Sequence, residues 1–257
     1  MGAAVEGGSL PIDTCGMLVT EGLCMTNVVA FSGGKDSTAL AYRMAERGEV
    51  FRLLFTPTQN ELDDVAPHVE GTARSLGVEL ILPPGPSLMG LIAHFGSLPN
   101  NRQRWCTRMI KIQPCIAWLK ANPGTTLCVG LRADEEERQG LYGDFATYRF
   151  PLREWGWGLR EVRGYLEKAG IAIPDRTDCA LCYDQRLIDW KKLLLRHPDR
   201  YAEGERLEAE TGFTFRSPSR DTWPASLAAL RKEFESGRKV RGEDRDTEQT
   251  ACRVCRL

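Results

Sequence analysis

The chain has 257 residues, of which 42% are hydrophobic and 27% charged, and this is enough for one principal core with a smaller appendage. Its net charge of -1 lacks the overall basic excess that would by itself indicate a nucleic-acid-binding protein. No apolar run reaches about 18 residues, and acidic residues stand where a signal peptide has basic ones, so we expect a cytoplasmic protein without a membrane span.

Apolar runs alternate with helical patterns after a glycine-rich lead-in at residues 1–26. We predict buried strands at 28–31, 50–55, 78–82 and 125–131, and helices from about Ser37 to Gly48, over 65–76 and over 88–95. This alternation predicts an α/β fold for residues 27–178, with a doubly wound, mainly parallel sheet and helices on both faces.

Helical patterns dominate beyond Arg149. A short extended piece at 150–152 precedes predicted helices at 158–169 and 183–196, and a further helix has Pro224 as its first residue and Glu235 as its last. We therefore expect a helical C-terminal region at 179–236 and a charge-rich, mobile tail at 237–257.

A glycine-rich loop joins the first predicted strand to the first helix, and it comprises Phe31, Ser32, Gly33, Gly34, Lys35, Asp36 and Ser37. Glycines let main-chain N–H groups approach phosphate oxygens, and the helix N-terminus adds partial positive charge. Lys35 supplies a full charge, and the hydroxyls of Ser32 and Ser37 can donate. The spacing is not that of a Walker loop. These residues predict a phosphate-binding loop, with a turn that binds no ligand as the alternative.

A second polar segment, Gly130-Leu131-Arg132-Ala133-Asp134-Glu135, follows the last predicted strand of the sheet. Open α/β sheets bind their ligands beyond the carboxyl ends of the strands. Arg132 and Glu135 are therefore candidate site residues, although acidic runs of this kind are also common on solvated surfaces.

Nine cysteines in a reducing compartment indicate metal, redox or catalytic roles more than disulfides. We predict that Cys179 and Cys182, at the start of a helix, point at one site, and that Cys106 adds a third thiolate. Three cysteines leave one iron of a [4Fe-4S] cluster without a protein ligand, and such an iron can carry a sulfide. There are two alternatives. Cys179 and Cys182 could bind zinc together with Cys252 and Cys255, or the two pairs could form a dithiol relay. The remaining cysteines, Cys15, Cys24, Cys115 and Cys128, are expected to be small apolar residues.

The loop resembles that of the PP-loop, or N-type ATP pyrophosphatase, superfamily. Three later segments resemble its phosphoadenosine phosphosulfate (PAPS) reductase-like branch, which includes DNA phosphorothioation proteins. They are the Cys-Thr…Lys…Pro segment from Cys106 to Pro114, the Gly-x-Arg-x-x-Glu motif from Gly130 to Glu135, and the Phe-Pro-Leu…Trp segment from Phe150 to Trp155. The usual Asp-Thr-Gly-x-Glu stretch is degraded to Pro57-Thr58-Gln59-Asn60-Glu61.

The resemblance implies that ATP is split at the α-phosphate with Mg²⁺, leaving AMP on an acceptor and releasing pyrophosphate. Lys35 favours ATP, because members that use PAPS or APS generally lack the loop lysine. The loop residues and Gly130 would bind the nucleotide, and Lys35, Asp36, Arg132 and Glu135 would be catalytic, with Asp36 helping to hold Mg²⁺.

We therefore expect an ATP-dependent sulfurtransferase with a [4Fe-4S] cluster on Cys106, Cys179 and Cys182. Its sulfur donor would be a protein such as a cysteine desulfurase, and its acceptor DNA, RNA or a small molecule. One alternative is a sulfonucleotide reductase whose nucleophile is Cys252 or Cys255. Another is a non-catalytic nucleotide-binding module, which the degraded stretch at 58–61 favours.

Two groups of arginine and tryptophan residues are candidate nucleic-acid surfaces, because backbone contact and base stacking use these side chains. They are Arg102, Arg104, Trp105 and Arg108 in one group, and Trp155, Trp157 and Arg160 in the other. Burial of the tryptophans in the core is an equally good interpretation. The three histidines, His68, His94 and His197, share no ligand spacing and are expected to be structural or exposed.

Overall fold

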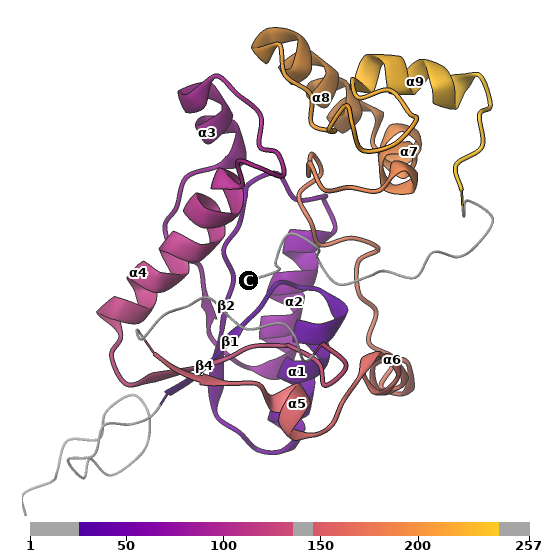
Figure 1. Cartoon of the computed structure of the whole chain (residues 1–257). Coiled ribbons are helices and arrows are strands. Elements are labelled where there is room, and N and C mark those ends of the chain that lie inside the picture. The colour runs from indigo at the N-terminus through magenta and orange to yellow at the C-terminus, as the bar shows by residue number, and fades with distance from the viewer. Residues whose placement is uncertain (1–25, 136–145, 242–257) are drawn as a thin grey trace, which may run out of the picture.

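A parallel sheet of five strands forms the centre of the computed structural model, which describes residues 26–135 and 146–241 (Figure 1). The strands are β1 (Thr26–Ala30), β2 (Phe51–Leu54), β3 (Leu80–Ile81), β4 (Thr125–Cys128) and β5 (Thr147–Arg149). They are ordered β3-β2-β1-β4-β5, so the chain extends the sheet to one side of β1 and then crosses to the other. Ligands of such sheets bind where the strand order reverses, which here is between the ends of β1 and β4.

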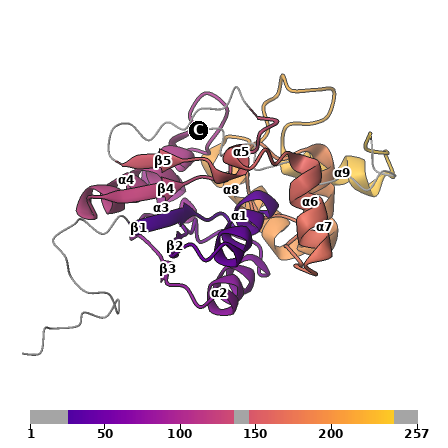
Figure 2. The same cartoon turned by 90° about the horizontal axis from the view of Figure 1, so that it is seen from below.

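Helices cover both faces of this sheet (Figures 1 and 2). Successive residues of a strand point to opposite faces, and accordingly Val28 and Val29 of β1 belong to two different buried clusters. Helix α4 (Gln113–Ala121) packs in the cluster of Val28, and α1 (Lys35–Glu46), α2 (Val65–Leu76) and α6 (Leu159–Lys168) pack in that of Val29. The predicted α/β fold class is therefore confirmed.

Three shorter helical elements complete this part of the chain: α3 (Leu88–Phe95), the π-helix η1 (Thr107–Ile112) and α5 (Pro151–Glu154). The side chain of Ser87 begins α3 by accepting a hydrogen bond from the N–H of Gly90 at 3.0 Å. Element η1 continues directly into α4. Short π-helical segments are rare and often lie at functional sites.

The C-terminal helices α7 (Leu187–Arg196), α8 (Pro198–Thr211) and α9 (Leu227–Glu235) gather at one end of the molecule (Figure 1). Trp190 of α7 packs against the rings of Tyr201 and Phe215. Glu208 of α8 is buried, and its two carboxylate oxygens accept the N–H groups of Phe215, at 2.9 Å, and Leu227, at 2.6 Å. This carboxylate fixes both ends of the loop between α8 and α9.

Several predicted boundaries are wrong, for identifiable local reasons. Residues 150–152 are not an extended piece, because Pro151 occupies the first turn of α5, where its missing N–H costs nothing. The predicted helix from 183 begins only at Leu187, so the two cysteines at 179 and 182 lie in a turn before it. The last helix starts at Leu227, because the Ser226 hydroxyl caps it by accepting the N–H of Ala229 at 3.3 Å.

Four helical segments, η1, α4, α5 and α8, were not predicted from the sequence. Among residues 26–135 and 146–241, no helix is long and apolar enough to cross a membrane. The lead-in up to residue 25 and the tail from residue 242, with Cys252 and Cys255, lie outside the described residues.

Candidate functional site

The predicted phosphate loop lies at the end of β1 and leads directly into α1. Helix α1 begins at Lys35, two positions earlier than expected, with Gly34 as its extended N-terminal cap. The first-turn N–H groups of a helix have no partner within it, so those of α1 are free to meet an anion. The hydroxyls of Ser32 and Ser37 lie 3.1 Å apart, and the Ser37 hydroxyl donates to the carbonyl of Gly34 at 3.1 Å.

Charged side chains of the loop and of the segment after β4 meet at this point. Lys35 is 4% exposed, and burial lowers the pKa of its ammonium group, while the charge of Asp36 acts in the opposite direction. Its Nζ lies 3.4 Å from Oδ2 of Asp36, and Nη1 of Arg132 lies 3.0 Å from the same oxygen. Arg132 also contacts Asp134 at 2.8 Å and Glu135 at 3.6 Å. The fold thus brings together all four residues that were predicted to be catalytic.

One atom of this group has no partner. The Oδ1 atom of Asp36 is buried and makes no hydrogen bond within the described part of the chain. An unpaired carboxylate oxygen is costly to bury, and carboxylate oxygens are preferred ligands of Mg²⁺. Asp36 therefore fits the role of a magnesium ligand.

Gly130 brings the segment after β4 against the phosphate loop. A Cβ atom at this position would lie 3.3 Å from the carbonyl carbon of Asp36 and 3.3 Å from the nitrogen of Ser37. Both neighbours are backbone atoms of the first turn of α1, so a side chain at position 130 would push the two loops apart by a few tenths of an ångström. The glycine in this motif is therefore required by close packing of the two loops.

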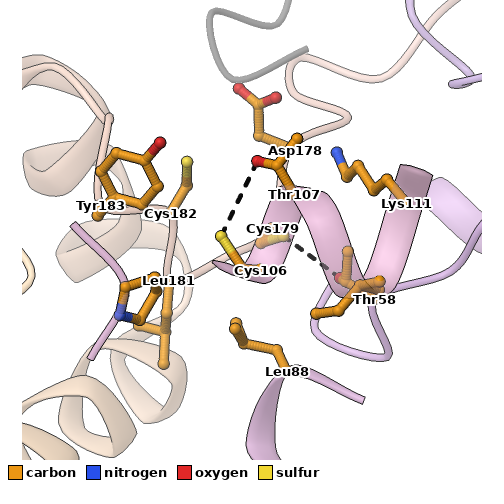
Figure 3. A pocket seen from close by; sticks show the side chains of 12 residues that line it. Thr58, Leu88, Cys106, Thr107, Lys111, Asp178, Cys179, Leu181, Cys182 and Tyr183 are labelled. Atoms are coloured by element: carbon orange, nitrogen blue, oxygen red, sulfur yellow. Dashed lines mark hydrogen bonds between the residues drawn. The ribbon is translucent and has the colours of Figure 1, made fainter. Parts of the chain in front are cut away.

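Cys106, Cys179 and Cys182 line one pocket, although they come from distant parts of the chain (Figure 3). Cys106 immediately precedes η1, and the other two lie in the turn between α6 and α7. In a π-helix, residues four and five positions apart share a side, and accordingly Cys106, Thr107, Ile110 and Lys111 all reach the pocket. The three cysteines that were predicted to share one site therefore all line the same pocket.

The three thiols do not converge closely enough for metal binding as they stand. Within residues 26–135 and 146–241, no group of three cysteine, histidine or acidic side chains has the arrangement of a metal site. Burial raises the pKa of Cys179 to about 11 and also raises the pKa values of Cys106 and Cys182. The free thiols are therefore protonated at neutral pH, and a bound cation would be needed to hold them as thiolates.

Cys115 and Cys128 lie elsewhere and are buried. Both belong to the hydrophobic clusters on the faces of the sheet, as expected for small apolar residues. Cys15 and Cys24 lie outside the described residues.

The segment 58–61, which departs from the usual family pattern, holds the turn that carries Cys179 and Cys182. The thiol of Cys179 donates to the hydroxyl of Thr58 at 3.3 Å, and this hydroxyl donates to Glu61 at 2.6 Å. Asn60 is 1% exposed and accepts the N–H of Ala180, at 2.6 Å, and of Leu181, at 3.1 Å. These two residues separate the two cysteines. This structural role of the altered stretch was not predicted from the sequence.

Gln59 stands where the family pattern has glycine, and its backbone keeps the conformation that favours glycine. Its φ is 58°, the only positive φ of a non-glycine residue in the described part of the chain. The left-handed conformation costs a residue with a Cβ about 1–2 kcal/mol. The turn after β2 has therefore kept its backbone shape although the glycine is gone.

The two arginine and tryptophan groups lie in different places. Trp105 is half-buried and packs on the exposed ring of Phe95 at 5.3 Å, and the neighbouring Cys106 and Thr107 line the pocket. Trp155 and Trp157 are half-buried and are covered by Arg47 and Arg43, at the end of α1 opposite the phosphate loop. The first group is therefore adjacent in sequence to residues that line the pocket, and the two tryptophans of the second group lie at the far end of α1.

His68 contacts the back of the phosphate loop. Its Nε2 atom lies 3.3 Å from the hydroxyl of Thr38, its ring stacks on Phe31, and burial lowers its pKa. A Cβ on Gly33 would lie 3.5 Å from this ring. His68 thus supports the loop, in line with a structural role, and nothing in the sequence indicated the contact. His94 packs edge-on against Phe95.

Comparison with known proteins gives a match to one family model. The model described as the phosphoadenosine phosphosulfate reductase domain matches residues 26–173. No curated protein matches the chain. The matched range contains the phosphate loop, the Arg132 segment and Cys106, and it ends before Cys179.

Two of the solved structures that are similar to the chain are the following. The phosphoadenylyl-sulfate (PAPS) reductase from Candida auris, in a phosphate complex, is 15% identical, over 57% of this chain and 74% of that one, with a TM-score of 0.46. A predicted subunit of tRNA methyltransferase from Methanocaldococcus jannaschii is 20% identical, over 56% of this chain and 74% of that one, with a TM-score of 0.37.

Proposed function

Because this chain belongs to the phosphoadenosine phosphosulfate reductase domain family, we propose that it is an ATP pyrophosphatase that adenylates an acceptor and then transfers sulfur to it. One observation carries this proposal. The phosphate loop and the three-cysteine pocket are joined by consecutive residues, since Thr177 lies against Gly34 while Asp178 and Cys179 line the pocket. Nucleotide chemistry and thiol chemistry would therefore take place side by side.

The charges of the loop support ATP as the nucleotide. In the proposed step, an oxygen of the acceptor attacks the α-phosphorus, a new O–P bond forms, and the bond to the β-phosphate breaks. Negative charge then builds on the leaving pyrophosphate. Lys35, Arg132 and the N–H groups at the start of α1 would stabilise this charge, and their proximity to one another supports the proposal.

Asp36 would hold the Mg²⁺ ion through its unpaired Oδ1, and Glu135 would keep Arg132 in place. The donor set of the pocket, three cysteines, fits an iron–sulfur cluster in its chemistry. A [4Fe-4S] cluster bound there would have one iron without a protein ligand and would supply the sulfur-handling chemistry. Lys111 and Thr107 would contribute positive charge and a hydroxyl beside it. Zinc bound by Cys179 and Cys182 together with Cys252 and Cys255 is the alternative cofactor.

Iron, sulfide and zinc analysis of anaerobically purified protein tests the cluster. We expect about four irons and four sulfides per chain, lost in both Cys106→Ala and Cys179→Ala. Cys115→Ala is the control, because it removes a buried thiol that does not line the pocket. Zinc in place of iron, or no metal at all, would refute the cluster.

Pyrophosphate release from ATP tests the adenylation step separately. Candidate acceptors are DNA, RNA and small molecules, with a cysteine desulfurase as sulfur donor. The wild-type protein should release pyrophosphate with one of these acceptors, and Lys35→Ala should not. Binding of ATP without pyrophosphate release under any acceptor would favour the non-catalytic module.

A sulfonucleotide reductase is the second candidate, and the name of the matched family favours it. Its nucleophile would be Cys252 or Cys255, in the part of the chain that the structure leaves undescribed. Truncation after Thr250 separates the two proposals. A reductase would lose turnover, whereas the sulfurtransferase would keep it.

A further inference from the structure

The side chain of Thr177 lies directly on the two glycines of the phosphate loop. Its methyl carbon would be 3.7 Å from a Cβ on Gly33, and its hydroxyl 3.2 Å from a Cβ on Gly34. Any larger residue at position 34 would displace Thr177. Gly34 therefore leaves room for the hydroxyl of this threonine, whereas a Cβ on Gly33 would only be in ordinary contact with its methyl group.

The hydroxyl of Thr177 joins those of two serines around Gly34. The Ser32 hydroxyl is 3.4 Å from the same Cβ position of Gly34 and 3.1 Å from the hydroxyl of Ser37. Both serine hydroxyls are hydrogen-bonded within the loop. The Thr177 hydroxyl, in contrast, makes no hydrogen bond to any described residue. A hydroxyl with an unused donor at the edge of a phosphate-binding loop is suited to a phosphate oxygen.

We propose that Thr177 is a ligand of the phosphate chain of the nucleotide and that it couples nucleotide binding to the cysteine pocket. This inference rests on the proposed function, because it takes a nucleoside triphosphate as the ligand of the loop. The family model ends at residue 173, so Thr177 belongs to the part of the chain that lies beyond the match.

The coupling between the phosphate loop and the cysteine pocket follows from the hydrogen bonds that hold the chain before and after Asp178. Arg176 donates to the carbonyl of Cys179 at 3.1 Å, and Asn60 accepts the next two N–H groups. Asp178 itself lines the pocket, and its Oδ1 is buried without a hydrogen bond to the described residues. Because these hydrogen bonds hold the segment, a movement of Thr177 on phosphate binding would also move Asp178 and Cys179.

Two variants of Thr177 separate its hydroxyl from its packing. Thr177→Val keeps the branched shape and removes the hydroxyl. Thr177→Ser keeps the hydroxyl and removes the methyl group. We would titrate each full-length protein with α,β-methylene-ATP and Mg²⁺ by calorimetry, because this analogue resists cleavage at the α-phosphate. A hydrogen bond to a charged phosphate predicts that the valine variant binds about tenfold more weakly, with the serine variant close to wild type. Thermal unfolding of each variant checks that it is folded.

Alkylation of Cys179 in the metal-free protein, in which this thiol is free, tests the coupling when it is followed by mass spectrometry of the peptide. The analogue should change the alkylation rate in the wild-type protein and in Thr177→Ser, but not in Thr177→Val at saturating analogue. Equal affinity of the valine variant and wild type would overturn the inference. The Lys35→Ala variant distinguishes failure of this inference from failure of the proposed function. If Lys35→Ala binds the analogue weakly while Thr177→Val binds it normally, only the role of Thr177 is wrong. If the wild-type protein does not bind the analogue, the proposed function fails and the inference with it.

Discussion

Replacement of Gln59 by glycine should stabilise the protein, which is the opposite of the usual effect of glycine. Gln59 has a φ of 58° and an exposed side chain, so the substitution removes backbone strain and little packing. Relief of the left-handed conformation is worth about 1–2 kcal/mol. The greater freedom of glycine in the unfolded chain costs about 0.4–1 kcal/mol. The expected net gain is roughly 0.5–1 kcal/mol.

Urea unfolding measures this gain as a higher midpoint with an unchanged slope. In a chain of this size, about 1 kcal/mol corresponds to a rise of roughly 2–4 °C in the melting temperature. Gln59→Ala is the matched control, because alanine also lacks the long side chain but keeps the Cβ and therefore the strain. It should unfold close to wild type. A glycine variant that is less stable than the alanine variant would refute the strain argument.

Three further changes test the site and the helical region. Lys35→Ala should weaken ATP binding by about ten- to a hundredfold in a calorimetric titration, because it removes a charged donor, whereas Lys168→Ala on the exposed face of α6 should not. Gly130→Ala should lower the melting temperature by the equivalent of about 1–3 kcal/mol, because its methyl group meets the backbone of α1; Gly164→Ala, with open space around it, should not. Burial raises the pKa of Glu208 to about 7, so the native state keeps a proton that the unfolded chain has released, and stability should fall as pH rises from about 4.5 to 7. The loss is at most about 3 kcal/mol, and unfolding at pH 5 and pH 8 should show a smaller difference in Glu208→Gln.

The position of the phosphate loop could be predicted because its signals are local. A buried strand, glycines and a helix start are adjacent in the sequence, and they fix the loop wherever the rest of the chain packs. Residue spacing was less informative after the helix that was predicted to end at residue 196, because the helix that begins at Pro198 was not expected. The proline does follow α7, but it is also the first residue of α8, and a fixed φ with no N–H suits both positions.

The role of segment 58–61 could not be predicted, because its partners lie about 120 residues away. Asn60 in the sequence is one polar residue after a strand, and nothing nearby indicates that it accepts the N–H groups of Ala180 and Leu181. The contact of Thr177 with the loop glycines could not be predicted for the same reason, because these residues are distant in the sequence.

The sequence by itself determined the alternation of strands and helices, the phosphate loop and the set of candidate residues, because periodicity, glycine placement and charge act over a few neighbouring residues. Only the tertiary structure decided which of them meet. Arg132 pairs with Asp36 across 96 positions because β1 and β4 are neighbours in the sheet. Cys106 faces Cys179 and Cys182 because a π-helix and a turn held by Asn60 close on one pocket. Contacts of this kind depend on how the elements pack, which no short window of sequence specifies.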